Sequence, residues 1–169
     1  LSFYMPNFTI NRFSVAMFNA SYYLSSSKNY KSNNTYITDF FYPIDGLLNW
    51  NRIYGKKGFI EYQFAIPYKY ANETIEEILK IISTSRLGSF IAAIKPIGKS
   101  RGIISFPMDG ITLAIDFAYS SRLFSILDTI DDIVLARGGR VYLSKDSRLS
   151  SDRFGQMYTE SLIEWDSIR

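Results

Sequence analysis

Four short apolar-rich stretches of the chain predict β-strands, and in two of them hydrophobic and polar residues alternate with the period of two that strands show. The stretches are FIEYQFAIP at 59–67, SFIAAIKP at 89–96, ITLAIDF at 111–117 and RVYLS at 140–144. In the first and third stretches the apolar residues occupy every second position. One face of each of these strands should therefore be buried and the other left open.

Two longer stretches between these strands carry apolar residues three and four positions apart, which is the period of an amphipathic helix. They predict helices over about 72–86 and 120–137, the first beginning at Asn72 or Thr74. The resulting order, β-α-β-β-α-β, predicts an α+β fold of the ferredoxin-like type. In that fold an antiparallel sheet carries both helices on one face, with the first and third strands at its centre.

Helices are also expected near both ends of the chain, over about 11–23 and 151–164. The Ser-, Asn- and Lys-rich stretch 25–35 is expected to be a loop. The chain should thus have three parts, namely an N-terminal helical segment with a loop at 1–35, a ferredoxin-like domain at 36–144 and a C-terminal segment at 145–169.

The composition narrows the chemistry open to the chain. Its 169 residues carry a net charge of +3 without a run of Lys or Arg, which argues against a nucleic-acid interface. Cys and His are both absent, so disulfides, thiolate metal sites, cysteine nucleophiles and histidine-dependent triads are excluded, and no metal site is expected. Proton transfer must then use Lys, Tyr, Asp or Glu. No stretch approaches the roughly 18 apolar residues of a transmembrane segment.

Polar residues gather on the open face that the strand pattern predicts. From three strands this face should carry Glu61, Gln63, Lys95, Thr112, Ala114 and Asp116. Such a face is either a solvated surface or the floor of a site for a polar ligand. RNA-recognition modules share this element order, but they stack bases on aromatic residues of the open face. Here the third strand offers an acid there, so RNA binding is not expected.

Lys145 follows the last predicted strand, in the stretch YLSKDSR at 142–148. Two interpretations of this lysine are open. It is either the solvated end of a strand or a cation held at the rim of an active site.

Five stretches resemble a known family in their order along the chain. They are PIDGLLNWNRIYGKKGFIEYQF at 43–64, IKPIG at 94–98, ISFPMDGITLAIDF at 104–117, GGRVYLSKDSR at 138–148 and FGQMY…EW within 154–165. They are similar to the C-terminal half of FAD-dependent oxidoreductases of the decaprenylphosphoryl-β-D-ribose 2′-oxidase family, within the vanillyl-alcohol-oxidase superfamily. This resemblance implies an FAD-binding domain, absent from these 169 residues, and a ferredoxin-like substrate domain above the flavin.

The resemblance assigns roles to individual residues. Lys145 matches the active-site lysine close to flavin and substrate, and Tyr142 matches a tyrosine at the flavin edge. The substrate-pocket positions that it implies are Phe41, Glu61, Gln63, Lys95, Thr112 and Ala114. Gln63 and Lys95 agree with the family, whereas the other four replace a tyrosine, a glutamine, an asparagine and a cysteine. These replacements leave the identity of the sugar open.

The implied reaction is hydride transfer from a secondary alcohol carbon of a sugar to FAD, with Lys145 fixing the hydroxyl group or helping to accept its proton. The sugar could be a polyprenyl-phosphoryl ribose undergoing 2′-epimerisation with a partner reductase. An aldonolactone or other small-sugar oxidase of the same superfamily, or a non-catalytic ligand-binding module, remain alternatives. The chain alone should be inactive and should form a homodimer through exposed apolar surfaces. A bacterial cytoplasmic or membrane-peripheral location is expected.

Overall fold

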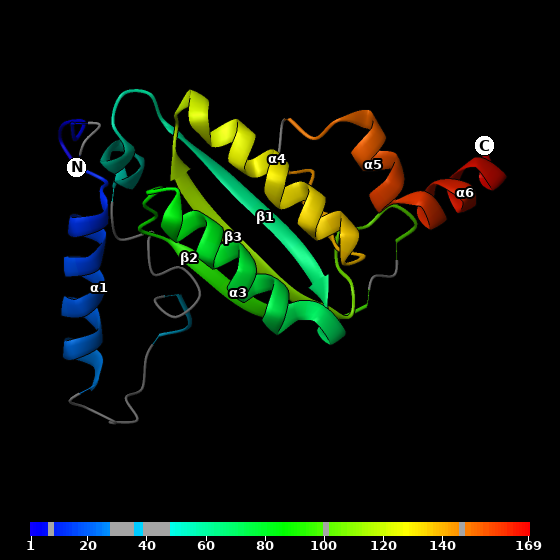
Figure 1. The fold of residues 1–169 in the computed structure, drawn as a ribbon, viewed down its shortest axis with the longest axis horizontal. Coiled ribbons are helices and arrows are strands. Elements are labelled where there is room, and N and C mark those ends of the chain that lie inside the picture. The colour runs from blue at the N-terminus through cyan, green and yellow to red at the C-terminus, as the bar shows by residue number, and fades with distance from the viewer. Residues whose placement is uncertain (7–8, 28–35, 39–47, 100–101, 146–147) are drawn as a thin grey trace.

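The computed structural model describes residues 1–6, 9–27, 36–38, 48–99, 102–145 and 148–169. Within these residues a mixed helix and strand architecture is present, with one sheet in the antiparallel order β2-β3-β1-β4 (Figure 1). Its strands are β1 (Phe59–Pro67), β2 (Ala92–Ile97), β3 (Gly110–Ala118) and β4 (Arg140–Val141). The predicted α+β fold is confirmed, with the first and third strands at the centre of the sheet.

Two amphipathic helices, α3 (Tyr68–Thr84) and α4 (Ser121–Ala136), lie side by side across one face of the sheet (Figure 1). The apolar positions of the two central strands point towards them, as the alternation predicts. The fully buried core includes Phe64, Ile78, Leu113, Phe117, Leu127 and Ile130. Each such side chain contributes about 1.5–3 kcal/mol through burial, so this face holds the sheet and helices together.

The boundaries of α3 differ from the sequence prediction. The helix begins at Tyr68, directly after the last residue of β1, and Pro67 takes the N-cap position without a side-chain cap. Thr74, an expected cap, is instead fully buried within the helix. The proline explains the early start, because its fixed φ of −56° ends the strand and suits the entry to a helix.

The last predicted strand is much shorter than 140–144, because β4 contains only Arg140 and Val141. The Tyr142 amide still donates to the Gln63 carbonyl at 2.8 Å, but the chain then turns, and the Lys145 amide donates to the Tyr142 carbonyl at 3.1 Å. Lys145 therefore sits on a turn that leaves the edge of the sheet, rather than at the tip of a strand.

Helix α1 (Arg12–Ser27) extends into the stretch predicted as a loop, of which 28–35 lie outside the described residues. The C-terminal stretch forms two helices where one was expected, α5 (Ser151–Met157) and α6 (Thr159–Ile168). They separate at Tyr158, which is buried and whose hydroxyl donates to the Val141 carbonyl at 3.0 Å. Packing of this tyrosine against the sheet edge outweighs the continuous helical pattern.

A buried ion-pair network attaches the C-terminal segment to α4. Asp131 is fully buried, accepts a hydrogen bond from the Tyr62 hydroxyl at 2.6 Å and pairs with Arg148 at 2.7 Å. Arg148 also pairs with Asp128 at 2.8 Å, and Arg153 of α5 reaches the same carboxylate at 3.0 Å. These contacts fix the chain on the helical side of the sheet only three residues after Lys145.

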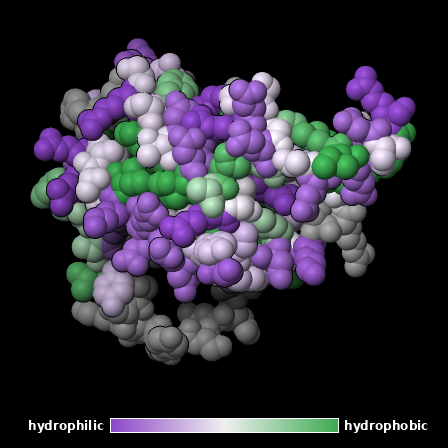
Figure 2. All heavy atoms as spheres, turned by 45° about the vertical axis from the view of Figure 1, so that its right-hand side comes forward, coloured by the Kyte–Doolittle hydropathy of each residue, from purple (hydrophilic) through white to green (hydrophobic). Residues whose placement is uncertain are grey.

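Apolar side chains remain exposed at both ends of the described chain. Figure 2 shows green side chains at the projecting C-terminal end, where Ile163 and Ile168 of α6 are exposed. On α1 the exposed apolar residues include Phe13, Met17, Phe18, Tyr22 and Leu24. Among the described residues, no helix combines the length and apolarity that a membrane-spanning segment requires.

Candidate functional site

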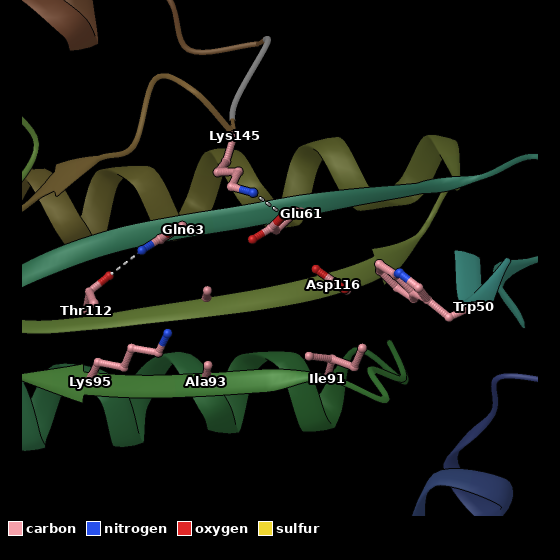
Figure 3. Close-up of a pocket in the computed structure, with 10 residues that line it drawn as sticks. Trp50, Glu61, Gln63, Ile91, Ala93, Lys95, Thr112, Asp116 and Lys145 are labelled. Carbon is pink, nitrogen blue, oxygen red and sulfur yellow. Dashed lines mark hydrogen bonds and ion pairs between the residues drawn. The ribbon is translucent and has the colours of Figure 1, made fainter. Parts of the chain in front are cut away.

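A pocket of about 370 Å³ lies on the open face of the sheet, on the side away from α3 and α4. Figure 3 shows side chains from three strands, the turn after β4 and the short 3-10 helix η1 (Trp50–Tyr54) around it. It is lined by Trp50, Glu61, Gln63, Ile91, Ala93, Lys95, Thr112, Ala114, Asp116 and Lys145. The open face is thus hollowed, with polar groups gathered in the hollow.

Strand register explains how the pocket floor is built. The pairs between β1, β3 and β2 place Gln63, Ala114 and Ala93 in one row across the sheet. The two alanines leave room above the middle of the sheet, and larger polar side chains flank them. Lys95 lies opposite Thr112 in the next row, so one lysine approaches the floor from the β2 edge.

Lys145 approaches from the other edge, across β1 (Figure 3). Its ammonium group lies 2.7 Å from the Glu61 carboxylate, and both side chains are partly exposed. The hydrogen bond to Glu61 raises the pKa of Lys145, although partial desolvation opposes it. A base would need a lowered lysine pKa, so of the two roles expected for Lys145 this geometry favours fixing a hydroxyl group as a cation and hydrogen-bond donor over accepting its proton.

Gln63 and Thr112 form a fixed polar pair on the floor. The Gln63 side-chain amide donates to the Thr112 hydroxyl at 3.0 Å, and that hydroxyl donates to the Phe64 carbonyl at 2.8 Å. Because Thr112 is almost fully buried, its hydroxyl requires hydrogen-bond partners inside the protein, and these two groups supply them. The pair holds the Gln63 amide in one orientation, as a site that binds hydroxyl groups requires.

Asp116 also faces the pocket, and we did not assign it a role from the sequence. It lies directly opposite Glu61 in the register of β1 and β3, and only 6% of its surface is exposed. Burial and then the Glu61 charge raise the pKa of Asp116 to about 6, although the Lys145 charge and the nearby Tyr54 hydroxyl oppose them. The alternation on β3 placed this acid on the open face, but no sequence signal gives the depth of its burial.

Trp50 closes the pocket beside Asp116 (Figure 3). No sequence pattern described above predicts this tryptophan at the site. Asn49, in the left-handed region at φ 57°, turns the chain into η1. Asn is among the residues that tolerate this conformation best. Rings of Tyr54 and Phe59 then lie 6.2 and 5.2 Å from the Trp50 ring and fix its place. The aromatic residues of the stretch WNRIY at 50–54 were the sequence signal that could have indicated a packed element here.

Two more residues, Tyr142 and Phe41, were expected at the site. Tyr142 stacks on Phe106 with ring centroids 4.5 Å apart and does not line the pocket. It is connected to the pocket only through the backbone, because its amide donates a hydrogen bond to the Gln63 carbonyl. Phe41 lies outside the described residues. In the part of the chain that is described, no cluster of three or more acidic side chains could hold a metal ion.

The fold and the pocket define this chain as a ferredoxin-like α+β domain with a pocket lined by polar groups on its open sheet face. Over 97% of its length it is 34% identical to the decaprenylphosphoryl-β-D-ribose oxidase of Mycolicibacterium smegmatis, which confirms the resemblance seen in the sequence. The match spans 165 residues but only 35% of that oxidase, and is consistent with its C-terminal part.

A second relative is 40% identical over 60 residues, or 35% of this chain and 16% of its own length. It is a Streptomyces coelicolor protein described only as an uncharacterized protein in the mprA 5′ region. No family model matches the chain.

Proposed function

We propose that this chain is the substrate-binding part of a flavin-dependent oxidoreductase that oxidises a secondary alcohol of a sugar. One observation carries the proposal: hydroxyl-binding and charged side chains converge on one pocket in a chain that is similar to a ribose oxidase. Its volume of about 370 Å³ is near the small end of ligand sites and suits a sugar-sized group.

The pocket offers complementary groups to such a sugar. Gln63 and Glu61 supply amide and carboxylate groups for hydroxyls, and Lys95 and Lys145 supply cations at opposite edges. A phosphate joined to the sugar would favour the side of either lysine. We propose a polyprenyl-phosphoryl pentose as the substrate, with its lipid outside the pocket and a partner reductase completing a 2′-epimerisation.

The donor set also fits an adjacent flavin. A protonated lysine at the rim suits the negative charge that a flavin gains on reduction, and Lys145 is such a lysine. When bound, FAD would accept the hydride. Lys145 and Tyr142 would contact it from this chain, and the rest of its site would come from outside these residues. Lys145 would orient the reacting hydroxyl group, and the walls of the pocket would exclude water from it.

The test is the visible spectrum of the full-length flavoprotein before and after anaerobic addition of a polyprenyl-phosphoryl pentose. We expect a flavin spectrum that bleaches with this compound. Bound flavin that does not bleach would reject the sugar, and a free aldonolactone that bleaches it would support a small-sugar oxidase. A protein that binds no flavin would overturn the proposal and leave a non-catalytic binding module.

Lys145→Met provides the residue-level test, because it keeps most of the length of the unbranched lysine side chain and removes its charge. We expect loss of bleaching with flavin still bound. Lys56→Met is the matched control, since Lys56 is an exposed lysine outside the pocket. Normal bleaching by the Lys145 variant would reject the assigned role.

A further inference from the structure

Asp116 is a buried carboxyl group on the floor of the pocket. It projects from the C-terminal part of the central strand β3, beside Trp50 and Glu61 (Figure 3). Within the described residues, no basic side chain lies within ion-pair distance of it, because Lys145 pairs with Glu61 instead. A carboxylate in such a place is costly unless it gains a proton or a hydrogen-bond donor.

The aromatic and titratable groups that face Asp116 come from three elements, and the strand edge at β2 adds only the apolar Ile91 beside it. Glu61 lies opposite on β1, Tyr54 and Trp50 lie on η1, and Lys145 lies on the turn after β4. The Tyr54 hydroxyl is buried and, among the described residues, has no hydrogen-bond partner of good geometry. Burial, followed by the Asp116 charge, raises the pKa of Tyr54, so this hydroxyl stays protonated.

The two neighbouring carboxyl groups thus lie in different surroundings. Glu61 is neutralised by its ion pair with Lys145, at the partly exposed rim. Asp116 is deeper, and its pKa is raised to about 6. A general base works best when its pKa lies near the working pH, and a pKa of about 6 brings this carboxyl group closer to neutral pH.

We infer that Asp116, rather than Lys145, accepts the proton of the substrate hydroxyl group during oxidation. The inference rests on the proposed function. The O–H bond breaks and its proton passes to the Asp116 carboxylate. The C–H bond breaks with its electron pair, which leaves as hydride to the flavin oxidant, and the carbon–oxygen double bond forms. Lys145 remains protonated throughout and stabilises negative charge on the reacting oxygen.

The experiment measures the rate of flavin reduction by the alcohol substrate against pH, by anaerobic stopped flow in the full-length flavoprotein. In the unaltered protein we expect the rate to rise as pH increases through about 6, because the carboxylate form is the active one. Asp116→Asn should slow reduction by about 100- to 10,000-fold and abolish this rise. Asp116→Glu should keep part of the rate, and Tyr54→Phe should move the rise to higher pH.

Asp109→Asn is the matched control, because Asp109 is an exposed acid just before β3 and outside the pocket. It should leave both rate and pH profile unchanged. A readout independent of the reaction is the infrared carbonyl stretch of a protonated carboxyl group. It should appear on acidification through pH 6 in the unaltered protein and be absent in Asp116→Asn.

Three results would overturn the inference. An Asp116→Asn protein that reduces flavin within a few-fold of the normal rate would remove the base role. Retention of the normal pH profile in that variant would assign the titration to another group. Unaltered protein that binds flavin but is not reduced by any secondary alcohol would overturn the proposed function, and the base role with it. In that case the infrared titration would still distinguish an error about the reaction from an error about Asp116.

Discussion

The ammonium group of Lys145 lies 2.7 Å from the carboxylate of Glu61, and this ion pair joins the turn after β4 to the central strand β1. The two residues are 84 positions apart in the chain. The pair keeps a cation at the rim of the pocket and leaves the deeper Asp116 without a basic partner. This division of charge is the basis of the predictions for the site.

The first prediction concerns the ion pair itself. Glu61→Gln should lower the pKa of Lys145, because the hydrogen bond to the carboxylate is the largest cause of its raised value. Since a raised lysine pKa stabilises the fold until pH exceeds that pKa, its contribution should disappear only in strong alkali. Both side chains are partly exposed, so the change in unfolding free energy should be within about 1 kcal/mol. NMR titration of the lysine side-chain nitrogen measures the first effect, and an unaltered titration would contradict the prediction.

The second prediction concerns pH and stability at Asp116. The pKa of this carboxyl group is about 6 in the folded protein and 3.8 in its reference state. Between these values the folded state binds more protons than the unfolded state, so stability should fall as pH rises through this window. Asp116→Asn removes the titrating group and with it this fall in stability. The variant should therefore have an unfolding free energy about 3 kcal/mol higher than the unaltered protein above pH 7. Urea unfolding at pH 4 and pH 8 tests this, and an equal effect at both would contradict it.

The third prediction concerns the buried network beneath the sheet. Arg148→Met leaves the fully buried Asp131 without its 2.7 Å partner, and should cost about 3–5 kcal/mol of unfolding free energy. Arg153→Gln is the matched control. Its side chain is more exposed than that of Arg148 and pairs chiefly with the half-exposed Asp128 and the exposed Asp132, so about 1 kcal/mol or less is expected. Equal losses of unfolding free energy in the two variants, measured by urea unfolding, would contradict the prediction that the burial of Asp131 makes its ion pair more important.

The fourth prediction concerns the volume of the pocket. Ala114→Leu adds three carbon atoms at the centre of the floor, so substrate affinity should fall by at least about tenfold while the fold persists. Ala92→Leu is the control, because Ala92 is exposed and lies outside the pocket on the neighbouring strand. Equilibrium titration with the substrate measures the effect. Unchanged affinity in the Ala114 variant would place the ligand elsewhere.

The periodic parts of the chain were predictable because local pattern and final packing agree there. Alternation along 59–67 and 111–117 gave β1 and β3 and the face on which each side chain lies. The same pattern placed Glu61, Gln63 and Thr112 together, since side chains of adjacent antiparallel strands share a face when their register matches. Boundaries were less predictable: Pro67 started α3 early, and packing of Tyr158 divided the C-terminal helix.

By itself, the sequence determined the fold class, the polar composition of the open face and the exclusion of cysteine and histidine chemistry. Each of these depends on residue type and local spacing alone. Tertiary structure decided the rest: that η1 brings Trp50 over the sheet, that Lys145 pairs with Glu61, and that Asp116 is buried deeply enough to raise its pKa. The physical reason is that desolvation and Coulomb interactions depend on distances between groups far apart in the chain, and only the folded arrangement sets those distances.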